Sequence, residues 1–325
     1  MQDVIIVDNI EKTFWVPEEV SGFWNKVKNV FWRKKKDKNI ISELSFNIKQ
    51  GEMVGYIGVN GSGKSTTIKM LTGIYPPTSG TIECLGKNPF KQRLDYVRDI
   101  GVVFGNRSLL NYDIAPKFSL DLYASIYRIQ KNKAKIRYTK FAKRLKVDHL
   151  MNTPVRKLSL GERMKFEIIA SLLHKPKIIY LDEPTIGLDI VARETMIDFL
   201  REINEKGKTT IFLTTHNMDD IEELCDRVII IDAGKKIYDG SLTDVKERFA
   251  NWKRITLTFS EQTQPFKHRF EILEKNEELL SFKCPNKKLK DTIDKILNCF
   301  EIIDLKIEEP QLKEVVKKIY VDKKV

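Results

Sequence analysis

The sequence has few cysteines, few histidines and no long apolar run, and each shortage excludes a class of protein. No two of its four cysteines have the spacing of a metal-binding or redox motif, and its four histidines are scattered. We therefore expect neither a zinc site nor a disulfide framework, but reduced, mostly buried thiols. No stretch approaches the roughly 18 apolar residues that cross a bilayer, and the N-terminus lacks a signal-peptide pattern. The sequence predicts a soluble, cytosolic chain unless something recruits it to a membrane.

The composition is that of a protein with a hydrophobic core, and its basic residues are unevenly distributed along the chain. The 325 residues are 42% apolar and 31% charged, enough for a large domain plus a smaller one, or for two modest domains. The net charge is +12. Residues 20–40 contain seven basic residues and one acidic residue, Asp37, so this segment carries a net charge of +6, half of the total. Such a local surplus predicts a surface that meets phosphates of lipid headgroups or nucleic acid. A solvated lysine-rich face is the plainer alternative.

The apolar patterning predicts two regions. Before Gly240, short apolar runs at 53–57, 178–181 and 210–213 are each followed by polar or glycine-rich segments, which is typical of buried parallel strands in an α/β domain. Further strands are expected at 2–10 and 40–48, a turn around Pro76, Pro77 and Gly80, and helices at 64–71 and within 117–150. After Gly240, strands are expected at 254–260, 279–284 and 302–307, and helices at 287–298 and from Pro310 onward. This second region predicts a small α+β domain.

A glycine-rich loop follows the strand at 53–57 and opens the helix at 64–71. It fits G-x-x-x-x-G-K-[ST] and comprises Gly58, Val59, Asn60, Gly61, Ser62, Gly63, Lys64, Ser65 and Thr66. The glycines allow successive N–H groups to face phosphate oxygens, and the helix N-terminus adds partial positive charge. Lys64 suits the β- and γ-phosphates, and the Ser65 hydroxyl suits Mg²⁺. The motif predicts binding of a nucleoside triphosphate.

Two carboxylates end the strand at 178–181. Side chains of adjacent strand residues point to opposite faces, so Asp182 is expected to reach the Mg²⁺ shell while Glu183 faces the γ-phosphate. Glu183 would then orient and deprotonate an attacking water. His216 follows the strand at 210–213 and is placed to donate a hydrogen bond to the γ-phosphate or to hold the water. A lone histidine after a strand is more often structural.

A third motif, at residues 158–162, indicates which class of P-loop ATPase the chain resembles. The segment Leu158–Glu162 resembles the LSGGQ signature of ATP-binding-cassette (ABC) transporters, so the chain resembles their nucleotide-binding subunit over residues 1–240. In that family the signature of one subunit closes over the nucleotide held by its partner. The resemblance therefore implies that Ser159, Leu160, Gly161 and Glu162 act in trans, with a second nucleotide-binding subunit that is expected to be a second copy of this chain.

The remaining family positions are carried over one at a time. Phe14 resembles the aromatic residue that stacks on adenine, with Trp15 as the fallback, and Asp189 resembles the loop that contacts the partner's active site. His216 matches the switch histidine. The family's glutamine switch is missing, and Asn106 is the nearest amide that could ligate Mg²⁺. The signature also departs from the pattern, because Leu160 replaces glycine and Glu162 replaces glutamine.

The resemblance also implies a fold class and a division of the chain into two domains. We expect an α/β P-loop NTPase: a RecA-like core with an antiparallel β subdomain, and a helical subdomain at about 105–165. The cassette would occupy 1–240, and an accessory α+β domain 241–325. The run from Val103 to Ser108 and an insert at 17–38 resemble the ATPases of daunorubicin- and viologen-exporter-like systems, whose membrane subunit is a separate multi-span protein.

The insert predicts an amphipathic helix. On a helical wheel Phe23, Trp24, Val27, Val30 and Phe31 share one arc, with basic residues outside it. Such a face suits an anionic lipid surface, so residues 19–37 are expected at the membrane. Packing of the same face against the cassette or the membrane subunit is the alternative.

These features predict an ATPase that powers transport, with export favoured, through a separate membrane permease, at the cytoplasmic face of the cell membrane. Its cofactors would be ATP and Mg²⁺. Two alternatives are a cassette ATPase acting on nucleic acid or ribosomes and a regulatory subunit that binds ATP without hydrolysing it. Nucleic acid is disfavoured because the chain has a single P-loop and no coiled-coil heptads. Intact Lys64, Asp182, Glu183 and His216 argue against the second alternative.

Overall fold

The computed structural model describes residues 2–17, 35–105, 108–259, 270–276, 278–299 and 302–322. The chain forms two compact units, Met1–Asp239 and Gly240–Val325, and each has its own sheets and helices. Asn106 and residues 18–34 lie outside the described part. The residues of the predicted amphipathic helix, Phe23 to Arg33, are among them, so that helix stays a prediction.

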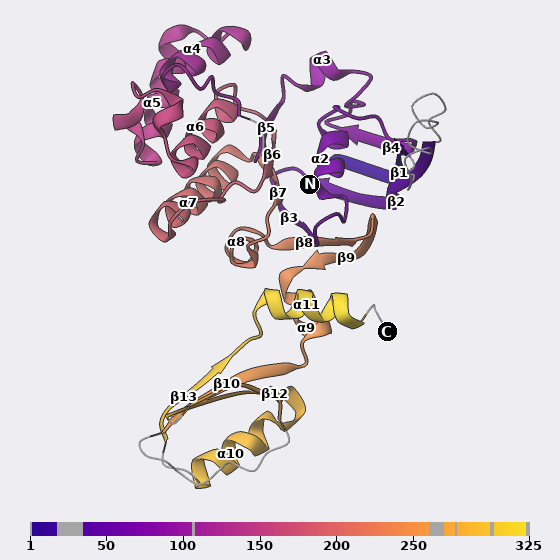
Figure 1. Ribbon diagram of the computed structural model, residues 1–325, viewed down its shortest axis with the longest axis vertical. Coiled ribbons are helices and arrows are strands. Elements are labelled where there is room, and N and C mark those ends of the chain that lie inside the picture. Colours follow the sequence, from indigo (N-terminus) through magenta and orange to yellow (C-terminus); the bar gives the residue numbers. More distant parts are fainter. Residues whose placement is uncertain are drawn as a thin grey trace, which may run out of the picture. The chain divides into compact units, whose positions relative to one another are not determined.

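A six-stranded sheet forms the centre of the first unit (Figure 1). Its order is β5 (Ile100–Phe104), β6 (Ile178–Asp182), β7 (Thr210–Thr214), β3 (Met53–Gly58), β8 (Arg227–Asp232) and β9 (Lys235–Ser241). The pairs from β5 to β8 are parallel. Every residue of β3 and β7 is buried, as expected of central strands covered on both faces. Polar segments that follow β3, β6 and β7 therefore meet at one edge of the sheet.

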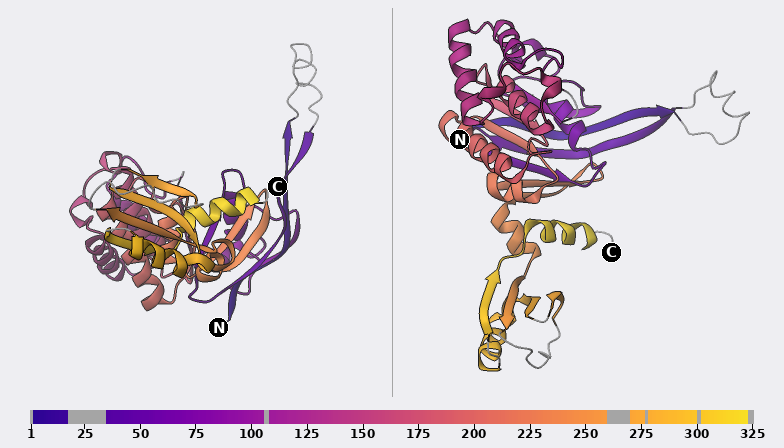
Figure 2. Two further views of the ribbon diagram at one scale, coloured as in Figure 1. Left: turned by 90° about the horizontal axis from the view of Figure 1, so that it is seen from below. Right: turned by 60° about the vertical axis from the view of Figure 1, so that its left-hand side comes forward.

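A three-stranded antiparallel sheet lies beside it, in the order β2 (Lys35–Lys49), β1 (Asp3–Pro17) and β4 (Ser79–Cys84). β1 and β2 are longer than predicted and pair as far as Pro17 and Lys35, and Figure 2 shows them running side by side beyond the rest of the sheet. The two ends of the insert predicted at 17–38 therefore belong to strands, Pro17 to β1 and residues 35–38 to β2. Gly80, predicted in a turn, lies within β4.

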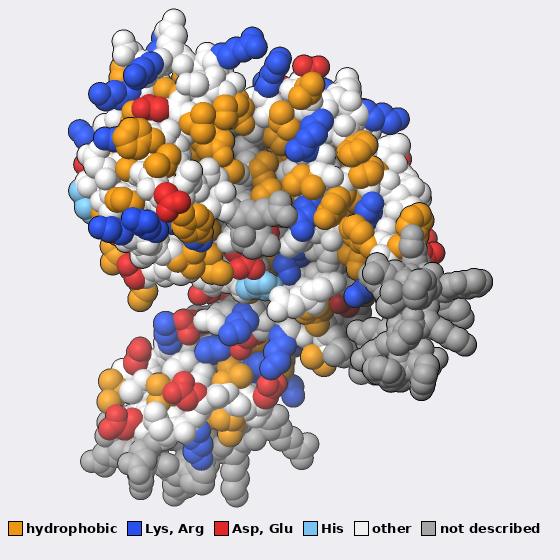
Figure 3. Space-filling view, turned by 45° about the horizontal axis from the view of Figure 1, so that its top comes forward, with side chains coloured by type: hydrophobic (Ala, Val, Ile, Leu, Met, Phe, Trp, Pro, Cys, Tyr) orange, Lys and Arg blue, Asp and Glu red, His pale blue; other side chains and the backbone are white. Residues whose placement is uncertain are grey.

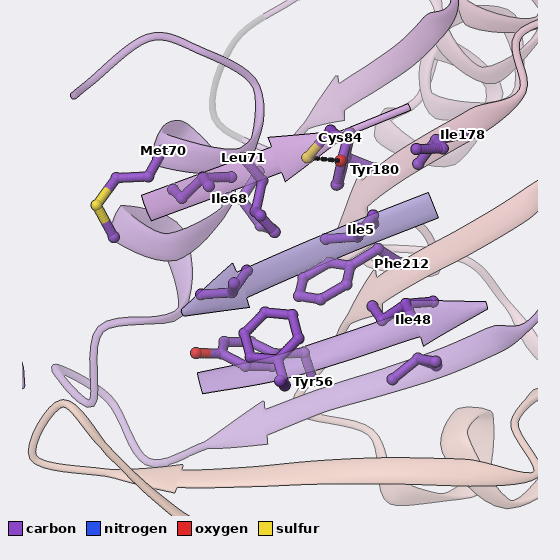
Figure 4. Packing of buried hydrophobic residues seen from close by; sticks show 14 of the residues in the cluster. Ile5, Ile48, Tyr56, Ile68, Met70, Leu71, Cys84, Ile178, Tyr180 and Phe212 are labelled. Atoms are coloured by element: carbon purple, nitrogen blue, oxygen red, sulfur yellow. Dashed lines mark hydrogen bonds between the residues drawn. The ribbon is translucent and has the colours of Figure 1, made fainter. Parts of the chain in front are cut away.

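Helix α2 (Lys64–Leu71) packs between the two sheets. Its Ile68, Met70 and Leu71 share one buried cluster with Ile5 of β1 and Phe212 of β7, as Figure 4 shows. The rings of Tyr56 and Phe212 lie 5.0 Å apart in the same cluster. Dense packing of this kind fixes the start of α2, and thus the loop before it, relative to both sheets.

Helices occupy most of residues 117–150, as predicted. They are α4 (Pro116–Ile126), α5 (Lys131–Arg144) and the short η1 (Asp148–Leu150), followed by η2 (Val155–Lys157) and α6 (Leu160–Leu172). Pro116 occupies the first turn of α4, where its missing N–H is not needed. Figure 1 shows α4, α5 and α6 grouped on one side of the unit. The unit also contains α3 (Arg93–Tyr96), α7 (Ile190–Gly207) and α8 (Met218–Leu224).

The second unit is an α+β fold. Its antiparallel sheet has the order β11 (Ile272–Lys275), β12 (Leu279–Pro285), β10 (Trp252–Phe259) and β13 (Ile302–Glu308). It also contains α9 (Leu242–Phe249), η3 (Asn286–Lys288), α10 (Leu289–Cys299) and α11 (Leu312–Asp322). Ile296 of α10 is buried against Ile255, Leu257 and Phe282, so α10 covers one face of the sheet. Strand β11 was not predicted, and the last helix begins two residues after Pro310.

Cys84, Cys225 and Cys284 are buried free thiols, as predicted. Burial raises the pKa of the Cys84 thiol to about 12, which leaves it inert as a nucleophile. Among the described helices, none is long and apolar enough to cross a bilayer.

Candidate nucleotide-binding site

The glycine-rich loop connects β3 to α2, and its glycines are required by space and by backbone angle. A Cβ on Gly58 would lie 2.3 Å from Ser62 Oγ and 2.7 Å from the Ile231 carbonyl oxygen. Gly63, the N-cap of α2, has a φ of 108°, a conformation that residues with a side chain rarely adopt. The loop therefore holds its backbone close around the start of α2, where N–H groups lack partners within the helix.

The side chain of Lys64 folds back onto the start of this loop. Its Nζ donates hydrogen bonds to the carbonyl oxygens of Gly58 at 2.7 Å and Val59 at 3.2 Å. Burial lowers the pKa of the Lys64 ammonium, while the nearby Glu183 and Asp182 carboxylates act in the opposite direction. A buried cation held by two neutral carbonyls is well placed to bind an incoming anion.

The two carboxylates lie beside the loop. Asp182 ends β6, and its Oδ1 accepts a hydrogen bond of 2.5 Å from the Thr214 hydroxyl on β7. Glu183 leaves the strand with a φ of 58°, and its backbone N–H donates to the Thr214 carbonyl at 2.8 Å. Its Oε1 lies 3.0 Å from Nε2 of His216. The positive φ is uncommon for a residue with a side chain and directs Glu183 away from the strand path.

These groups line one cavity of about 580 Å³, a size typical of small-molecule sites. Of the predicted site residues, the lining contains Asn60, Gly61, Gly63, Lys64, Ser65, Thr66, Asp182, Glu183 and His216. Gly58, Val59 and Ser62 belong to the same loop but do not line the cavity. Three segments that are distant in the sequence are thus brought together as the spacing predicted.

Phe14 does not line the cavity. Its ring packs edge to face on Tyr75 at 5.4 Å, and Lys12 Nζ lies 5.0 Å from its centroid. In the β1–β2 ladder, however, Phe14 lies opposite Lys38, which does line the cavity. Phe14 is therefore at the border of the site. Trp15 is 72% exposed.

The signature segment lies apart from this cavity: residues 159–162 are described, and none of them lines it. Ser159 caps α6. Its Oγ accepts from the Glu162 N–H at 3.2 Å, and the Glu162 carboxylate accepts from the Ser159 N–H at 2.8 Å. The unusual Glu162 thus completes a capping box. Leu160 is 40% exposed and contacts Gly187, where an added Cβ would lie 2.7 Å from the Leu160 side chain.

Asp189 follows that contact and caps α7, where its Oδ1 accepts a hydrogen bond of 2.8 Å from the Ala192 N–H. The signature segment and the loop before α7 therefore touch within one chain. This contact places Leu160 against its own chain's loop, which the sequence did not predict.

Sequence reasoning missed four residues that line the cavity, Lys38, Ile40, Gly105 and Ile186, and one charged residue that supports it from behind, Asp220. Lys38 was assigned to the insert, yet it lines the cavity as part of β2. Asp220, whose side chain is fully buried, bonds the hydroxyls of Thr185 at 2.5 Å and Thr215 at 3.2 Å and forms an ion pair of 2.5 Å with Arg193. It ties the segment after Glu183 to the segment before His216. Both roles depend on contacts with segments distant in the sequence: Lys38 with β1, and Asp220 with Thr185 and Arg193.

The oxygen donors at the cavity suit a Mg²⁺ ion that is shared with phosphates. Ser65 and Asp182 both line it and offer a hydroxyl and a carboxylate oxygen, the hard ligands that Mg²⁺ prefers. Among the described residues, no group of three or more His, Cys, Asp or Glu could hold a metal by itself. This donor set fits Mg²⁺, which keeps waters and usually binds through one or two protein ligands and substrate phosphates.

Comparisons with known proteins agree with this geometry. Residues 41–186 match the family model described as "ABC transporter". The ABC transporter ATP-binding protein NatA of Bacillus subtilis is 35% identical over 217 residues, which cover 67% of this chain and 88% of the relative. The Nod factor export ATP-binding protein I of Burkholderia orbicola is 36% identical over 208 residues, which cover 63% and 67%.

A solved structure of an ATP-binding subunit of an ABC transporter has the same fold, with a TM-score of 0.62 and 24% identity, and covers 76% of this chain and 93% of that chain. This likeness supports the predicted P-loop NTPase fold. The loop, the carboxylates, the signature and the relatives together show that this chain belongs to the ATP-binding subunits of ABC transporters, a family of ATPases.

Proposed function

We propose that this chain binds ATP with Mg²⁺ in the P-loop cavity and that hydrolysis there drives export through a separate membrane subunit. The observation that carries the proposal is the single cavity shared by Lys64, Asp182, Glu183 and His216. The loop N–H groups and Lys64 would bind the phosphates, and Lys38 adds a second cation at the wall. Ser65 and Asp182 would hold Mg²⁺, which supplies charge neutralisation at the phosphates.

Glu183 is proposed as the general base. It lines the cavity with its Oε1 3.0 Å from His216 Nε2, so the imidazole orients the carboxylate. A carboxylate held in this way removes a proton from a water that attacks the γ-phosphate. His216 is the positioning partner and is expected to donate to the γ-phosphate when the nucleotide is bound.

The site is proposed to be completed by a second copy of this chain. Residues 159–162 do not line their own cavity, yet Ser159 and Leu160 are exposed at the start of α6, a helix of 13 residues, with the buried Gly161 directly behind them. A helix N-terminus binds anions, and the signature of the partner copy would meet the γ-phosphate there. Asp189 would contact the partner next to it.

The membrane subunit is proposed to dock on the groove between the helical group and the central sheet. A cavity of about 200 Å³ lies there, lined by Ile74, Val102, Phe104, Tyr123 and Tyr127 among others. Beside it, α4 exposes Phe118, Leu122 and Ile126, at i, i+4 and i+8, by 53%, 59% and 61%. Figure 3 shows a hollow at the top of this unit with hydrophobic side chains on both sides. An exposed apolar stripe beside a hollow suits a short apolar helix of a partner.

Docking there would place the chain at the cytoplasmic face of the membrane. Export is proposed because a relative is named for Nod factor export. The test is affinity capture of the tagged full chain from detergent-solubilised membranes, followed by an ATPase assay of the complex. Capture of a multi-span membrane protein with Mg²⁺-dependent ATPase activity is expected. Capture of ribosomes or nucleic acid alone would contradict the proposal.

A further inference from the structure

Strand β13 of the second unit is an edge strand with an unusual side-chain pattern. It is the last strand in the sheet order, next to β10, and among the described residues no strand pairs with its outer side (Figure 1). Ile303 is 67% exposed and Ile307 40% exposed on this strand. An edge with exposed apolar residues is a template for pairing with another strand, unless charges or bulges protect it.

Charges are present on β13, but they alternate in sign. Asp304 and Lys306 lie opposite Thr258 and Thr256 of β10, on the face away from α10. Leu305 and Ile307 lie opposite Leu257 and Ile255, on the face that α10 covers. Each face of the strand is therefore uniform: charged on one side of the sheet and apolar on the other.

We propose that β13 pairs with β13 of a second copy, antiparallel and centred on Leu305, which joins the two C-terminal sheets into one. A two-fold axis perpendicular to the sheet makes the interface symmetric: where residue i of one copy lies opposite residue j of the other, residue j of the first lies opposite residue i of the second. Centred on Leu305, it sets Asp304 opposite Lys306 of the other copy, twice, and Leu305 opposite itself. Ile303 and Ile307 flank this centre, and their exposed apolar surface becomes buried.

Neighbouring registers that keep the apolar faces together are less favourable. Centring on Asp304 or on Lys306 sets a like charge opposite itself, which is destabilising. Lys306 forms an ion pair of 2.7 Å with Glu308 of its own chain, and this pair competes with the pairing between copies in either register. Centring on Ile307 sets Lys306 opposite Glu308 of the other copy and so pairs opposite charges too. That register, however, leaves half of the strand unpaired, since β13 ends at Glu308.

The ladder between β10 and β13 limits the length of the pairing. Its register shifts between Thr258 and Phe259, so that Thr258 lies opposite Asp304 and Phe259 opposite Ile302. Ile303 is the extra residue of this β-bulge, and regular pairing therefore starts at Asp304. The central pairs formed by Asp304, Leu305 and Lys306 lie within the regular part.

The pairing is independent of the nucleotide sandwich, so it is tested on the full chain without nucleotide and with EDTA. Sedimentation equilibrium should show a dimer. Asp304→Lys sets like charges opposite each other twice and should raise the dimer dissociation constant about tenfold or more. Asp304→Lys combined with Lys306→Asp restores opposite charges and should recover most of the loss. Asp294→Lys, an exposed charge reversal on α10, is the matched control and should change nothing.

Leu305→Cys gives a second readout, because the two thiols would meet at the axis and form an intermolecular disulfide on mild oxidation, while the wild-type chain would not. A wild-type monomer without nucleotide would overturn the proposal. So would an Asp304→Lys dimer of unchanged affinity, a folded double variant that is not rescued, or no disulfide in Leu305→Cys. A weakening by Lys306→Asp without one by Asp304→Lys would point to the Ile307 register and would equally overturn it.

Discussion

Nε2 of His216 lies 3.0 Å from Oε1 of Glu183, although the two residues follow different strands, β7 and β6. The contact joins a carboxylate at the wall of the cavity to an imidazole that fixes its direction. It depends on two further links, the Glu183 N–H bond to the Thr214 carbonyl and the network of Asp220. The position of the Glu183 carboxylate therefore depends on the pairing of β6 with β7.

Replacing the proposed base should separate binding from hydrolysis. Glu183→Gln keeps the shape and the phosphate loop, so ATP affinity should stay within about twofold. Hydrolysis should fall by about 10²- to 10⁴-fold, because the amide cannot accept the proton of water. Lys64→Ala is the contrasting variant and should lose ATP affinity itself. Fluorescent-nucleotide binding and phosphate release measure the two effects, and wild-type hydrolysis by Glu183→Gln would contradict the assignment.

Asp220→Asn should weaken both the fold and the chemistry. The change removes the buried one of the two anionic partners of Arg193, Glu223 being the other, and weakens the acceptor for Thr185 and Thr215. Loss of charge-assisted hydrogen bonds at a buried carboxylate should lower the free energy of unfolding by about 2 kcal/mol. ATPase activity should fall with ATP affinity retained, since Asp220 does not line the cavity. Urea unfolding compared with Asp219→Asn, an exposed neighbour, tests this, and equal stability of the two variants would refute it.

The sequence predicted the parts of the site that are local and missed those that depend on pairing. Residues 58–66 specify their own turn, and Asp182 and His216 are marked by the apolar strands before them. Lys38 was counted with the basic insert at 17–38, because its local sequence is a run of lysines, and only its pairing opposite Phe14 of β1 assigns it to β2 and to the cavity. Asp220 has no distinguishing local signal, because it is one of two neighbouring acids in the first turn of α8. Strand β11 was missed because only its pairing with β12 defines it.

The apolar stripe on α4 should be needed for the membrane subunit but not for nucleotide binding. Leu122→Glu puts a charge in the middle of Phe118, Leu122 and Ile126 and should abolish capture of the membrane protein. Ile136→Glu on α5, which replaces another exposed apolar residue, is the matched control. ATP affinity should be unchanged in both. Normal capture by Leu122→Glu would place the docking surface elsewhere.

His174 should make the first unit less stable in acid. Its ring stacks on Tyr127 at 3.9 Å, and burial lowers the pKa of this histidine. The unfolded chain therefore binds a proton more readily than the folded one below the unfolded value of about 6.5. The free energy of unfolding should fall as the pH drops below about 6.5 and level off below the folded pKa. Urea unfolding against pH should show a shallower fall for His174→Gln, and an identical slope would contradict this role.

The central claim is that one chain's P-loop and the other chain's signature form each active site. Lys64→Ala disables the first element and Ser159→Phe the second, so either homodimer should be inactive. In a heterodimer of the two variants, isolated through two different affinity tags, one site combines an intact Lys64 with an intact Ser159. That heterodimer should recover about half of the wild-type ATPase rate, because one of two equivalent sites is whole. An inactive heterodimer, with both chains folded, would show that the signature does not act in trans.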